Sequence, residues 1–314
     1  MATRFLSLPL DQLTEPTSIA LAQQIECADI LTPLSQEPIA TAFVRQGEGD
    51  IPLVLLHGFD SSVLEFRRLL PLLASHYPTW AIDLLGFGFT ARCGNNQSAK
   101  PLAKPLAKQS AQIPFSAAAI KTHLYATWSV LIGQPMVLVG ASMGGAAAID
   151  FALTYPETVQ RLVLIDSAGF SAGPAIGKYL IPPLGYLATA YLRNLKVRQS
   201  ITLKAYHDPT YASADALRCT AMHLDQPGWQ QALIAFTRSG GYGSFQAKLA
   251  HLQTPTLILW GEQDQILGTA DAEKFQQAIP QSQLVWMPAC GHVPHLEKPQ
   301  ETAQAIFNFL ETSP

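Results

Sequence analysis

A serine flanked by glycines is the residue of this 314-residue chain best suited to act as a nucleophile. It lies in Gly140-Ala-Ser142-Met-Gly144-Gly145, directly after an apolar run and directly before an alanine-rich stretch. A nucleophile on a sharp strand-to-helix turn needs small neighbours, because the backbone is strained and other atoms approach closely. Gly140 and Gly144 are such neighbours. The N–H of Met143 would begin the helix, where free amides and the helix dipole favour a developing oxyanion.

A serine hydroxyl needs a histidine base at neutral pH, and the histidine needs a carboxylate that orients it. Among eight histidines, His292 lies in Ala289-Cys-Gly291-His292, just after the last apolar run. Asp264, in Gly261-Glu-Gln-Asp264, follows the preceding run. The order Ser142, Asp264, His292 is that of hydrolases with a nucleophile elbow. Asp166 also ends an apolar run and is a competing acid; its alternative role is to cap the turn that follows.

A second oxyanion donor is expected in His57-Gly58-Phe59, because a single N–H holds a tetrahedral oxyanion poorly. Gly58 would let the backbone come close, so that the N–H of Phe59 points into the cleft and His57 is structural. Asp60 comes next and would disturb an anion. It must therefore turn outward or be bound by Ser61 or Ser62.

No metal and no cofactor are expected. His292, His295 and Glu297 could be mistaken for a zinc set, but Pro294 interrupts the segment and no further ligand cluster is evident.

The elements that must position these residues are visible as short, continuous apolar runs that end in Gly, Asp or Pro. Such runs are typical of parallel strands buried on both faces. Helix-like segments lie between them, for example 64–72 and 120–131, so the chain is predicted to be a doubly wound α/β fold with its ligand site at the carboxyl ends of the strands. The runs span 53–56, 80–82, 136–139, 162–165, 256–260 and 284–287.

Two segments break this alternation. In 90–114 the tetrapeptide Lys-Pro-Leu-Ala occurs twice, and its prolines forbid a regular helix, so a surface loop is expected. In 171–252 the strand pattern stops and aromatic and aliphatic residues dominate. This block is predicted to be a helical cap over the ligand edge; a second packing layer is the alternative. The predicted division is an N-terminal extension (1–38), a core in two parts (39–170 and 253–314) and the cap between them.

Composition excludes several classes of protein. Hydrophobic residues make up 48% and charged residues 14%, which excludes a disordered chain. The net charge of −3 comes without a basic cluster, so no nucleic-acid partner is expected. No signal peptide and no spanning segment are evident, which predicts no stable membrane insertion. Four widely spaced cysteines are typical of reduced thiols, which favours a cytoplasmic protein.

Taken in order, the motifs resemble those of the α/β-hydrolase superfamily, from about residue 39 to 310. The resemblance implies an eight-stranded, mostly parallel sheet with helices on both faces, a helical cap inserted after the sixth strand, and acyl transfer through a serine without a cofactor. The motifs are His57-Gly58-Phe59, Asp83-Leu-Leu-Gly-Phe-Gly88, Gly140-Ala-Ser-Met-Gly-Gly145, Gly261-Glu-Gln-Asp264, Gly291-His292 and Glu297-Lys-Pro299.

Ser142 argues against the dehalogenases and epoxide hydrolases of this superfamily, which use aspartate at that place. The Ser-Met-Gly-Gly segment is similar to carbon–carbon bond hydrolases, esterases and cofactor-free perhydrolases. Many carbon–carbon hydrolases have Asn and Trp where this chain has Ala141 and Val293. The expected function is therefore hydrolysis of a small or medium apolar ester or related acyl compound. The alternatives are carbon–carbon cleavage of a β-diketone-like substrate and a non-catalytic small-molecule receptor; the oligomeric state is left open.

Overall fold

The structure is a computed structural model that describes residues 3–92, 114–171 and 183–312. Most of the predicted loop 90–114, the first part of the predicted cap and Cys93 lie outside these ranges. The other three cysteines, Cys27, Cys219 and Cys290, are free and buried.

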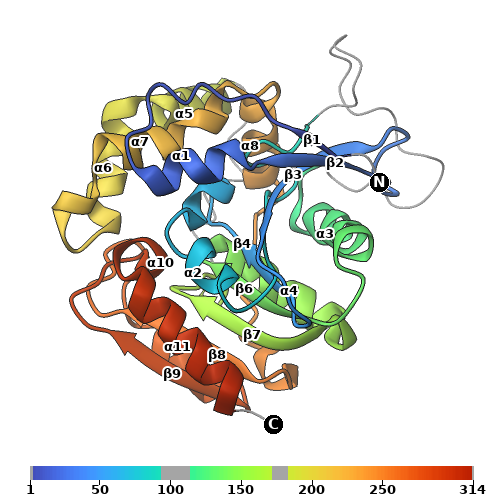
Figure 1. Cartoon of the computed structure of the whole chain (residues 1–314), viewed down its shortest axis with the longest axis vertical. Helices are drawn as coiled ribbons and strands as arrows, with labels where there is room; N and C mark the ends of the chain where they lie inside the picture. The colour runs from blue at the N-terminus through green and yellow to red at the C-terminus, as the bar shows by residue number, and fades with distance from the viewer. Residues whose placement is uncertain (1–2, 93–113, 172–182, 313–314) are drawn as a thin grey trace.

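A single sheet runs through the molecule (Figure 1). In the described ranges it has nine strands, in the spatial order β1-β2-β3-β5-β4-β6-β7-β8-β9. Every neighbouring pair from β5 to β9 is parallel, whereas β1, β2 and β3 pair antiparallel. The strands are β1 (Thr3–Phe5), β2 (Glu26–Ile30), β3 (Ile39–Gln46), β4 (Leu53–Leu56), β5 (Thr79–Ile82), β6 (Met136–Ala141), β7 (Val159–Ile165), β8 (Thr256–Gly261) and β9 (Ser282–Met287).

All six apolar runs of the sequence form strands, β4 to β9, so that prediction is confirmed. Two expectations need correction. In the described ranges the sheet has nine strands rather than eight, and the segment 1–38, expected to be an N-terminal extension, supplies β1 and β2 to the sheet through its described residues. The short edge strand β1 is exposed along its length and carries no apolar pattern, so only its backbone pairing with β2 reveals it.

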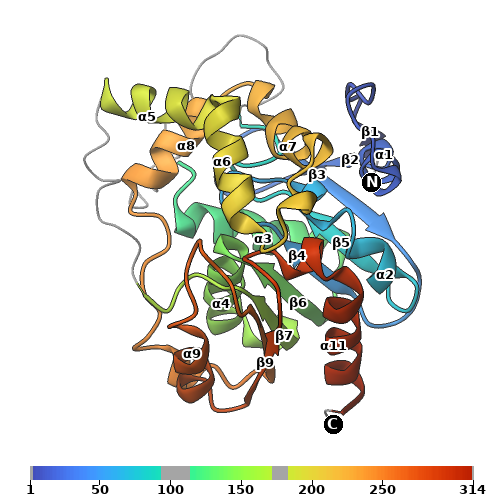
Figure 2. The ribbon, with the colours of Figure 1, turned by 90° about the vertical axis from the view of Figure 1, so that its left-hand side faces the viewer.

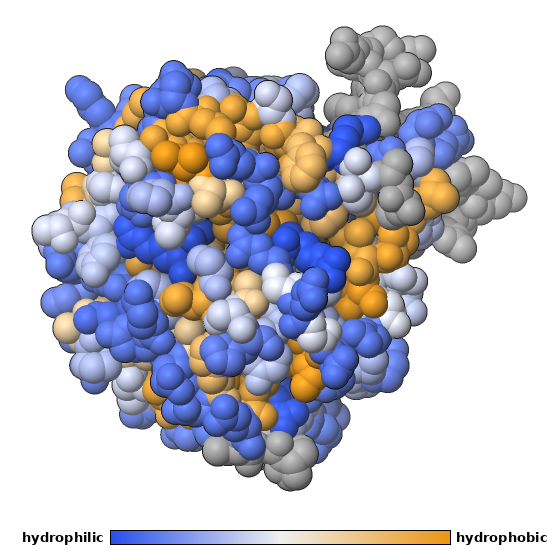
Figure 3. Space-filling view, in the orientation of Figure 1, coloured by the Kyte–Doolittle hydropathy of each residue, from blue (hydrophilic) through white to orange (hydrophobic). Residues whose placement is uncertain are grey.

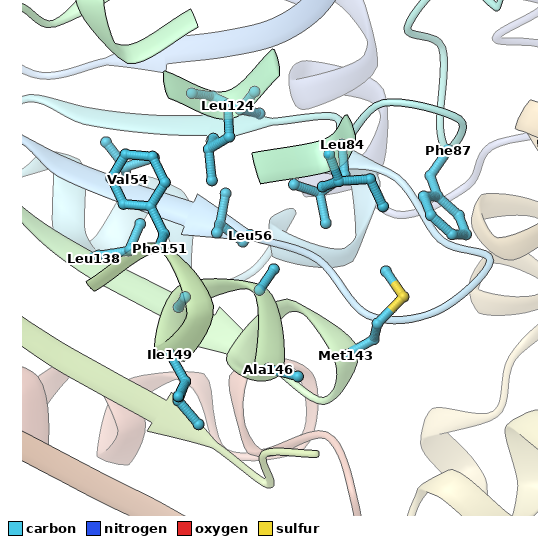
Figure 4. Close-up of a cluster of buried hydrophobic side chains, with 14 of the residues drawn as sticks. Val54, Leu56, Leu84, Phe87, Leu124, Leu138, Met143, Ala146, Ile149 and Phe151 are labelled. Carbon is cyan, nitrogen blue, oxygen red and sulfur yellow. The ribbon is translucent and has the colours of Figure 1, made fainter. Parts of the chain in front are cut away.

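Both faces of the sheet are buried. In β4, Val54 and Leu56 join one hydrophobic cluster, and the alternate residues Leu53 and Leu55 join the other. Figure 4 shows the first cluster, where Phe151 of α4 lies near Val54 and Leu138. Helices α3 (Ala117–Leu131), α4 (Met143–Thr154) and α9 (Ala272–Ala278) contribute to the first cluster, and α1 (Pro16–Gln23), α2 (Leu70–Ala74) and α11 (Pro299–Thr312) to the second.

A helical insertion separates β7 from β8; its described part comprises residues 183–252. Figures 1 and 2 place its helices together at one end of the molecule, away from α11. α5 contacts both α6 and α8. The insertion contains α5 (Leu184–Arg193), α6 (Leu195–Ala205), α7 (Ala214–Ala221), η5 (Met222–Asp225) and α8 (Trp229–Arg238).

In the ranges that the structure describes, no helix is both long and apolar enough to cross a bilayer.

Candidate active site

Ser142 lies on the turn between β6 and α4, with φ +52° and ψ −119°. A positive φ is uncommon for a residue with a side chain and costs about 1–3 kcal/mol. The glycines explain how the turn fits: a Cβ on Gly140 would lie 2.3 Å from the Gly144 carbonyl oxygen, and one on Gly144 would lie 2.1 Å from the Leu56 carbonyl oxygen. The sequence thus forms the strained strand-to-helix turn that the motif predicts.

His292 and Asp264 meet through a hydrogen bond of 2.9 Å between His292 Nδ1 and Asp264 Oδ2. The second oxygen of Asp264 accepts hydrogen bonds from the N–H groups of Ile266 and Leu267, at 2.7 and 3.0 Å. Burial alone would raise the pKa of Asp264, but the hydrogen bond and charge of His292 and the two amides outweigh it and lower that pKa. Asp264 is therefore a fixed carboxylate that orients the imidazole.

The loop of His292 is held by the insertion. The backbone N–H of His292 donates to the carbonyl oxygen of Ala205, at the end of α6, over 2.7 Å. The buried carboxylate of Glu297 accepts from the N–H of Gly291 at 2.8 Å and from that of Asp208, just after α6, at 2.7 Å. The position of the imidazole thus depends on how α6 sits on the core.

Asp166, the competing acid, is fully buried but makes no hydrogen bond to His292. Its carboxyl accepts from the N–H of Gly261 at 3.0 Å, so it holds the end of β8 rather than capping the turn that leaves β7. Burial and the nearby charge of Asp264 raise the pKa of Asp166 well above its usual value. This shift favours the neutral form of Asp166 beside the Asp264 carboxylate.

One atom each of Asp166, Asp264 and His292 lies within 4.8 Å of the others. The hydrogen bond between Asp264 and His292 already uses the His292 nitrogen nearest the acid, as expected for proton transfer rather than metal ligation. The set His292, His295 and Glu297 is not assembled. His295 lies beside Glu65, at 3.2 Å, and Glu297 accepts from backbone amides.

The two backbone N–H groups predicted as oxyanion donors belong to residues that adjoin Ser142 in the chain or in space. Met143 is the first residue of α4, and Phe59 follows Gly58, where a Cβ would lie 3.4 Å from the Cβ of Ser142. Within the described ranges, neither the N–H of Met143 nor that of Phe59 donates to a protein acceptor. Both amides therefore stay available beside Ser142.

The side chain of His57 holds the loop that contains Gly58 and Phe59. Its buried ring bonds the carbonyl oxygen of Gly58 through Nδ1, at 2.8 Å, and accepts from the N–H of Leu84 at Nε2, at 3.1 Å. Burial lowers the pKa of His57 to about 4. Its neutral ring is thus part of the scaffold.

Asp60 neither turns outward nor is bound by Ser61 or Ser62; both expectations were wrong. Its buried carboxylate pairs with Arg198 of α6 and accepts from His223 Nε2 at 3.1 Å and from Trp229 Nε1 at 2.7 Å. Burial would raise the pKa of Asp60, but His223, Arg198 and Trp229 together lower it. The three partners come from the insertion, more than 130 positions along the chain, so only tertiary structure reveals them.

Glu65 also holds this loop, although none of the sequence motifs contains it. Its carboxylate accepts from the N–H of Gly58, at 3.0 and 3.2 Å, and therefore fixes the residue before Phe59. Burial would raise the pKa of Glu65, but His295 and His57 lower it to about 2. Glu65 lies seven residues after Gly58, on the short helix η1 (Val63–Phe66). This position is the only feature of the sequence that could have pointed to its role.

Ser142, His292, Phe59, Asp60 and Glu65 line one cavity of about 270 Å³ between the core and the insertion. Ser142, His292 and Phe59 lie on its core side, and α6 supplies Arg198 and Thr202 opposite. Its walls are largely apolar, with contributions from Phe59, Leu192, Ile201, Ala205, Ile266 and Val293.

This fold and this turn are those of α/β hydrolases, and the comparisons agree. A profile described as "Alpha/beta hydrolase family" matches residues 53–305. The chain therefore belongs to the α/β-hydrolase family, and the resemblance seen in the sequence is confirmed.

Three curated relatives span different activities. The chain is 32% identical to "Alpha/beta hydrolase domain-containing protein VTE7" of Arabidopsis thaliana, over 97% of this chain and 89% of that protein. It is 30% identical to "Lipase 1" of Psychrobacter immobilis (83% and 78% covered). It is 27% identical to "2-hydroxy-6-oxo-6-(2'-aminophenyl)hexa-2,4-dienoic acid hydrolase" of Metapseudomonas resinovorans (92% and 94%).

The fold is shared with a solved thermophilic esterase from Thermogutta terrifontis, with a TM-score of 0.71 and 23% identity over 91% of this chain and 98% of that one.

Proposed function

We propose that this α/β hydrolase cleaves a small or medium apolar ester, or a related acyl compound, through an acyl-enzyme on Ser142. The observation that carries the proposal is that Ser142 on its strained turn and His292, which is hydrogen-bonded to Asp264, line one cavity together with Phe59. Any one of these groups alone could be explained by a purely structural role. Together they match the division of labour in a serine hydrolase.

In the first half-reaction His292 accepts the proton of the Ser142 hydroxyl while its oxygen attacks the substrate carbonyl. The N–H groups of Phe59 and Met143 bind the oxyanion of the tetrahedral intermediate. His292 then returns the proton to the leaving alcohol, and the acyl group stays on Ser142. Asp264 stabilises the imidazolium in both half-reactions.

In the second half-reaction a water molecule gives its proton to His292 and attacks the acyl carbon. The tetrahedral intermediate collapses, the carboxylic acid leaves, and His292 returns the proton to Ser142. No other reactant is needed. Within this proposal the insertion acts as a cap that closes the cavity over the substrate.

The cavity supports an apolar substrate of limited size. Its volume of about 270 Å³ lies at the lower end of ligand pockets, and its wall surface is largely apolar, although charged side chains such as Arg198 also line it. The 30% identity with a lipase also favours an ester.

Carbon–carbon cleavage of a β-diketone-like substrate is the second candidate. It is supported by the 27% identity with a dienoic acid hydrolase over most of both chains. Ala141 and Val293 weigh against it, since many such enzymes carry Asn and Trp there. A non-catalytic receptor is the third possibility.

The test is turnover of p-nitrophenyl esters from acetyl to long acyl chains by the wild type, Ser142→Ala and Ser75→Ala. Ser75 is exposed and distant from the cavity lining, so it is a matched control. We expect turnover to disappear in Ser142→Ala alone and to favour short or medium chains. Full activity of Ser142→Ala would overturn the mechanism.

Turnover of a dienoic ring-fission product without ester turnover would favour the carbon–carbon hydrolase. A ligand that raises the Tm without being turned over would favour the receptor.

A further inference from the structure

The outer side of the insertion exposes large apolar side chains. On α5, Leu187 is 63% and Tyr191 65% exposed, and Leu195 at the start of α6 is 55% exposed. Figure 3 shows apolar side chains gathered at the top of the molecule, where Figure 1 places α5. Scattered exposed leucines are ordinary, but a cluster on adjoining helices indicates an interaction surface.

The two faces of α5 differ. Leu184, Leu187 and Tyr191 follow one another at spacings of three and four, which places them on one face of a helix. Gly185 and Thr189 are buried on another face, toward the rest of the protein. The apolar stripe of α5 therefore points away from the core that the helix covers.

The charges of the same region are all positive. Residues 184–205, which form α5 and α6, contain no Asp or Glu. Two of their four cations have partners: Arg198 binds Asp60, and Arg193 binds Asp225. Lys196 and Lys204 of α6 are exposed, and neither forms an ion pair within the described ranges. The surface thus combines apolar side chains with free positive charge, as amphipathic membrane-surface helices do.

Some of the residues that line the cavity are themselves exposed. Ile201 of α6 and Ile266 each line the cavity and are exposed, at 45% and 39%. Phe59 also lines it and is exposed. The cavity that holds Ser142 therefore has exposed apolar side chains among its lining residues, and one of them belongs to α6.

We propose that the outer side of α5 and α6 docks on an anionic lipid surface, so that the hydrolase takes an apolar acyl substrate directly from the bilayer. The proposal rests on the proposed function for its substrate, but the docking can be tested without turnover. The side chains that would enter the interface are Leu184, Leu187, Tyr191 and Leu195, and Lys196 and Lys204 would face the lipid phosphates. Such docking is peripheral and needs no spanning helix.

The experiment is co-sedimentation of the full chain with vesicles of phosphatidylcholine alone and with vesicles that also contain phosphatidylglycerol. We compare the wild type, Leu187→Asp/Tyr191→Asp, Lys196→Glu/Lys204→Glu and the matched control Leu31→Asp, an exposed leucine beside β2. The wild type and the control should bind the anionic vesicles. The lysine variant should lose more than about fivefold in partitioning to anionic vesicles, and added salt should weaken the wild type similarly.

The apolar variant should lose binding to both kinds of vesicle. None of the four lysine and apolar positions lines the cavity, so each variant should keep wild-type turnover of a soluble ester, which also shows that it is folded. Ser142→Ala should bind vesicles like the wild type, and this separates a failure of docking from a failure of the proposed chemistry.

Equal binding by all variants, or no binding by the wild type, would overturn the proposal. If the wild type instead self-associates in a concentration-dependent manner that Leu187→Asp/Tyr191→Asp abolishes, without vesicle binding, the surface joins two copies of the chain and the lipid proposal is wrong.

Discussion

The indole N–H of Trp229 donates a hydrogen bond of 2.7 Å to the carboxylate of Asp60, and this contact joins α8 of the insertion to the loop that carries Phe59. Asp60 itself has φ +51°, a conformation that non-glycine residues adopt only when the surroundings hold them there. The insertion therefore does more than cover the cavity. It holds the backbone beside a proposed oxyanion donor.

We expect Trp229→Phe to lower both stability and turnover. The change keeps an aromatic ring but removes one buried donor, which costs about 1 kcal/mol in the free energy of unfolding. Because Phe59 adjoins Asp60, kcat on a soluble ester should fall several-fold while KM changes little. Denaturant unfolding and steady-state kinetics measure the two effects.

Trp128→Phe is the matched control. Its indole donates to the carbonyl oxygen of Gln134, at 3.0 Å, at the far end of α3. It should lose stability without losing kcat. Equal kinetics of the two variants would show that Asp60 does not position the loop.

The two buried acids near His292 should respond differently to the same change. Asp264→Asn removes the charge that faces the imidazole, and loss of the equivalent acid in a serine-protease triad lowers kcat by about 10⁴-fold. The raised pKa of Asp166 favours its neutral form, so Asp166→Asn should change the charge near His292 less than Asp264→Asn does. We expect Asp166→Asn to cost less than about tenfold in kcat. The reverse ranking would assign the catalytic acid to Asp166.

Ser142→Gly should be more stable than Ser142→Ala, by about 1 kcal/mol, although both lack the hydroxyl. Glycine adopts the positive φ of this turn without steric cost, whereas alanine keeps the strain. At Ser75, where φ is −68°, the order should reverse, with alanine the more stable. Chemical denaturation of the four variants provides the comparison. Stability of Ser142→Ala at or above that of Ser142→Gly would contradict strain at the turn.

The contribution of two buried histidines to stability should fall as the pH drops from about 6.5 to about 4. Burial lowers the pKa of both His57 and His123 from 6.5 to about 4, so between these values the unfolded chain binds more protons than the folded one. The contribution of these two histidines to stability must then rise with pH across this window, by about 1.4 kcal/mol per pH unit for each histidine, while the raised pKa values of the buried Asp83 and Asp166 act in the opposite direction.

The Tm measured across this range for the wild type and His123→Gln checks the linkage. His123 Nε2 bonds the Thr41 hydroxyl at 2.8 Å, and a glutamine keeps a polar group there without a charge change. The Tm of His123→Gln should rise less between about pH 4 and about pH 6.5 than the Tm of the wild type does. An unchanged slope would mean that His123 does not titrate on unfolding.

The sequence by itself determined the strands of the parallel sheet and the turn at Ser142. Continuous apolar runs are specified locally, since a strand buried on both faces needs apolar residues at every position. Gly140 and Gly144 likewise reveal the turn, because the backbone around them leaves no room for a Cβ. From the sequence, Asp264 and His292 were also predicted to be the acid and the base that follow Ser142 along the chain. The structure brings these two residues within hydrogen-bonding distance.

Only the tertiary structure decided which polar groups meet across long separations. The partners of Asp60 are Arg198, His223 and Trp229, and no local pattern pairs a loop after β4 with three elements of the insertion. The tertiary environment also lowers the pKa of Asp264 and raises that of Asp166, although both follow apolar runs. The physical reason is the same in each case: desolvation and long-range hydrogen bonds depend on packing, and packing is not a property of any short segment.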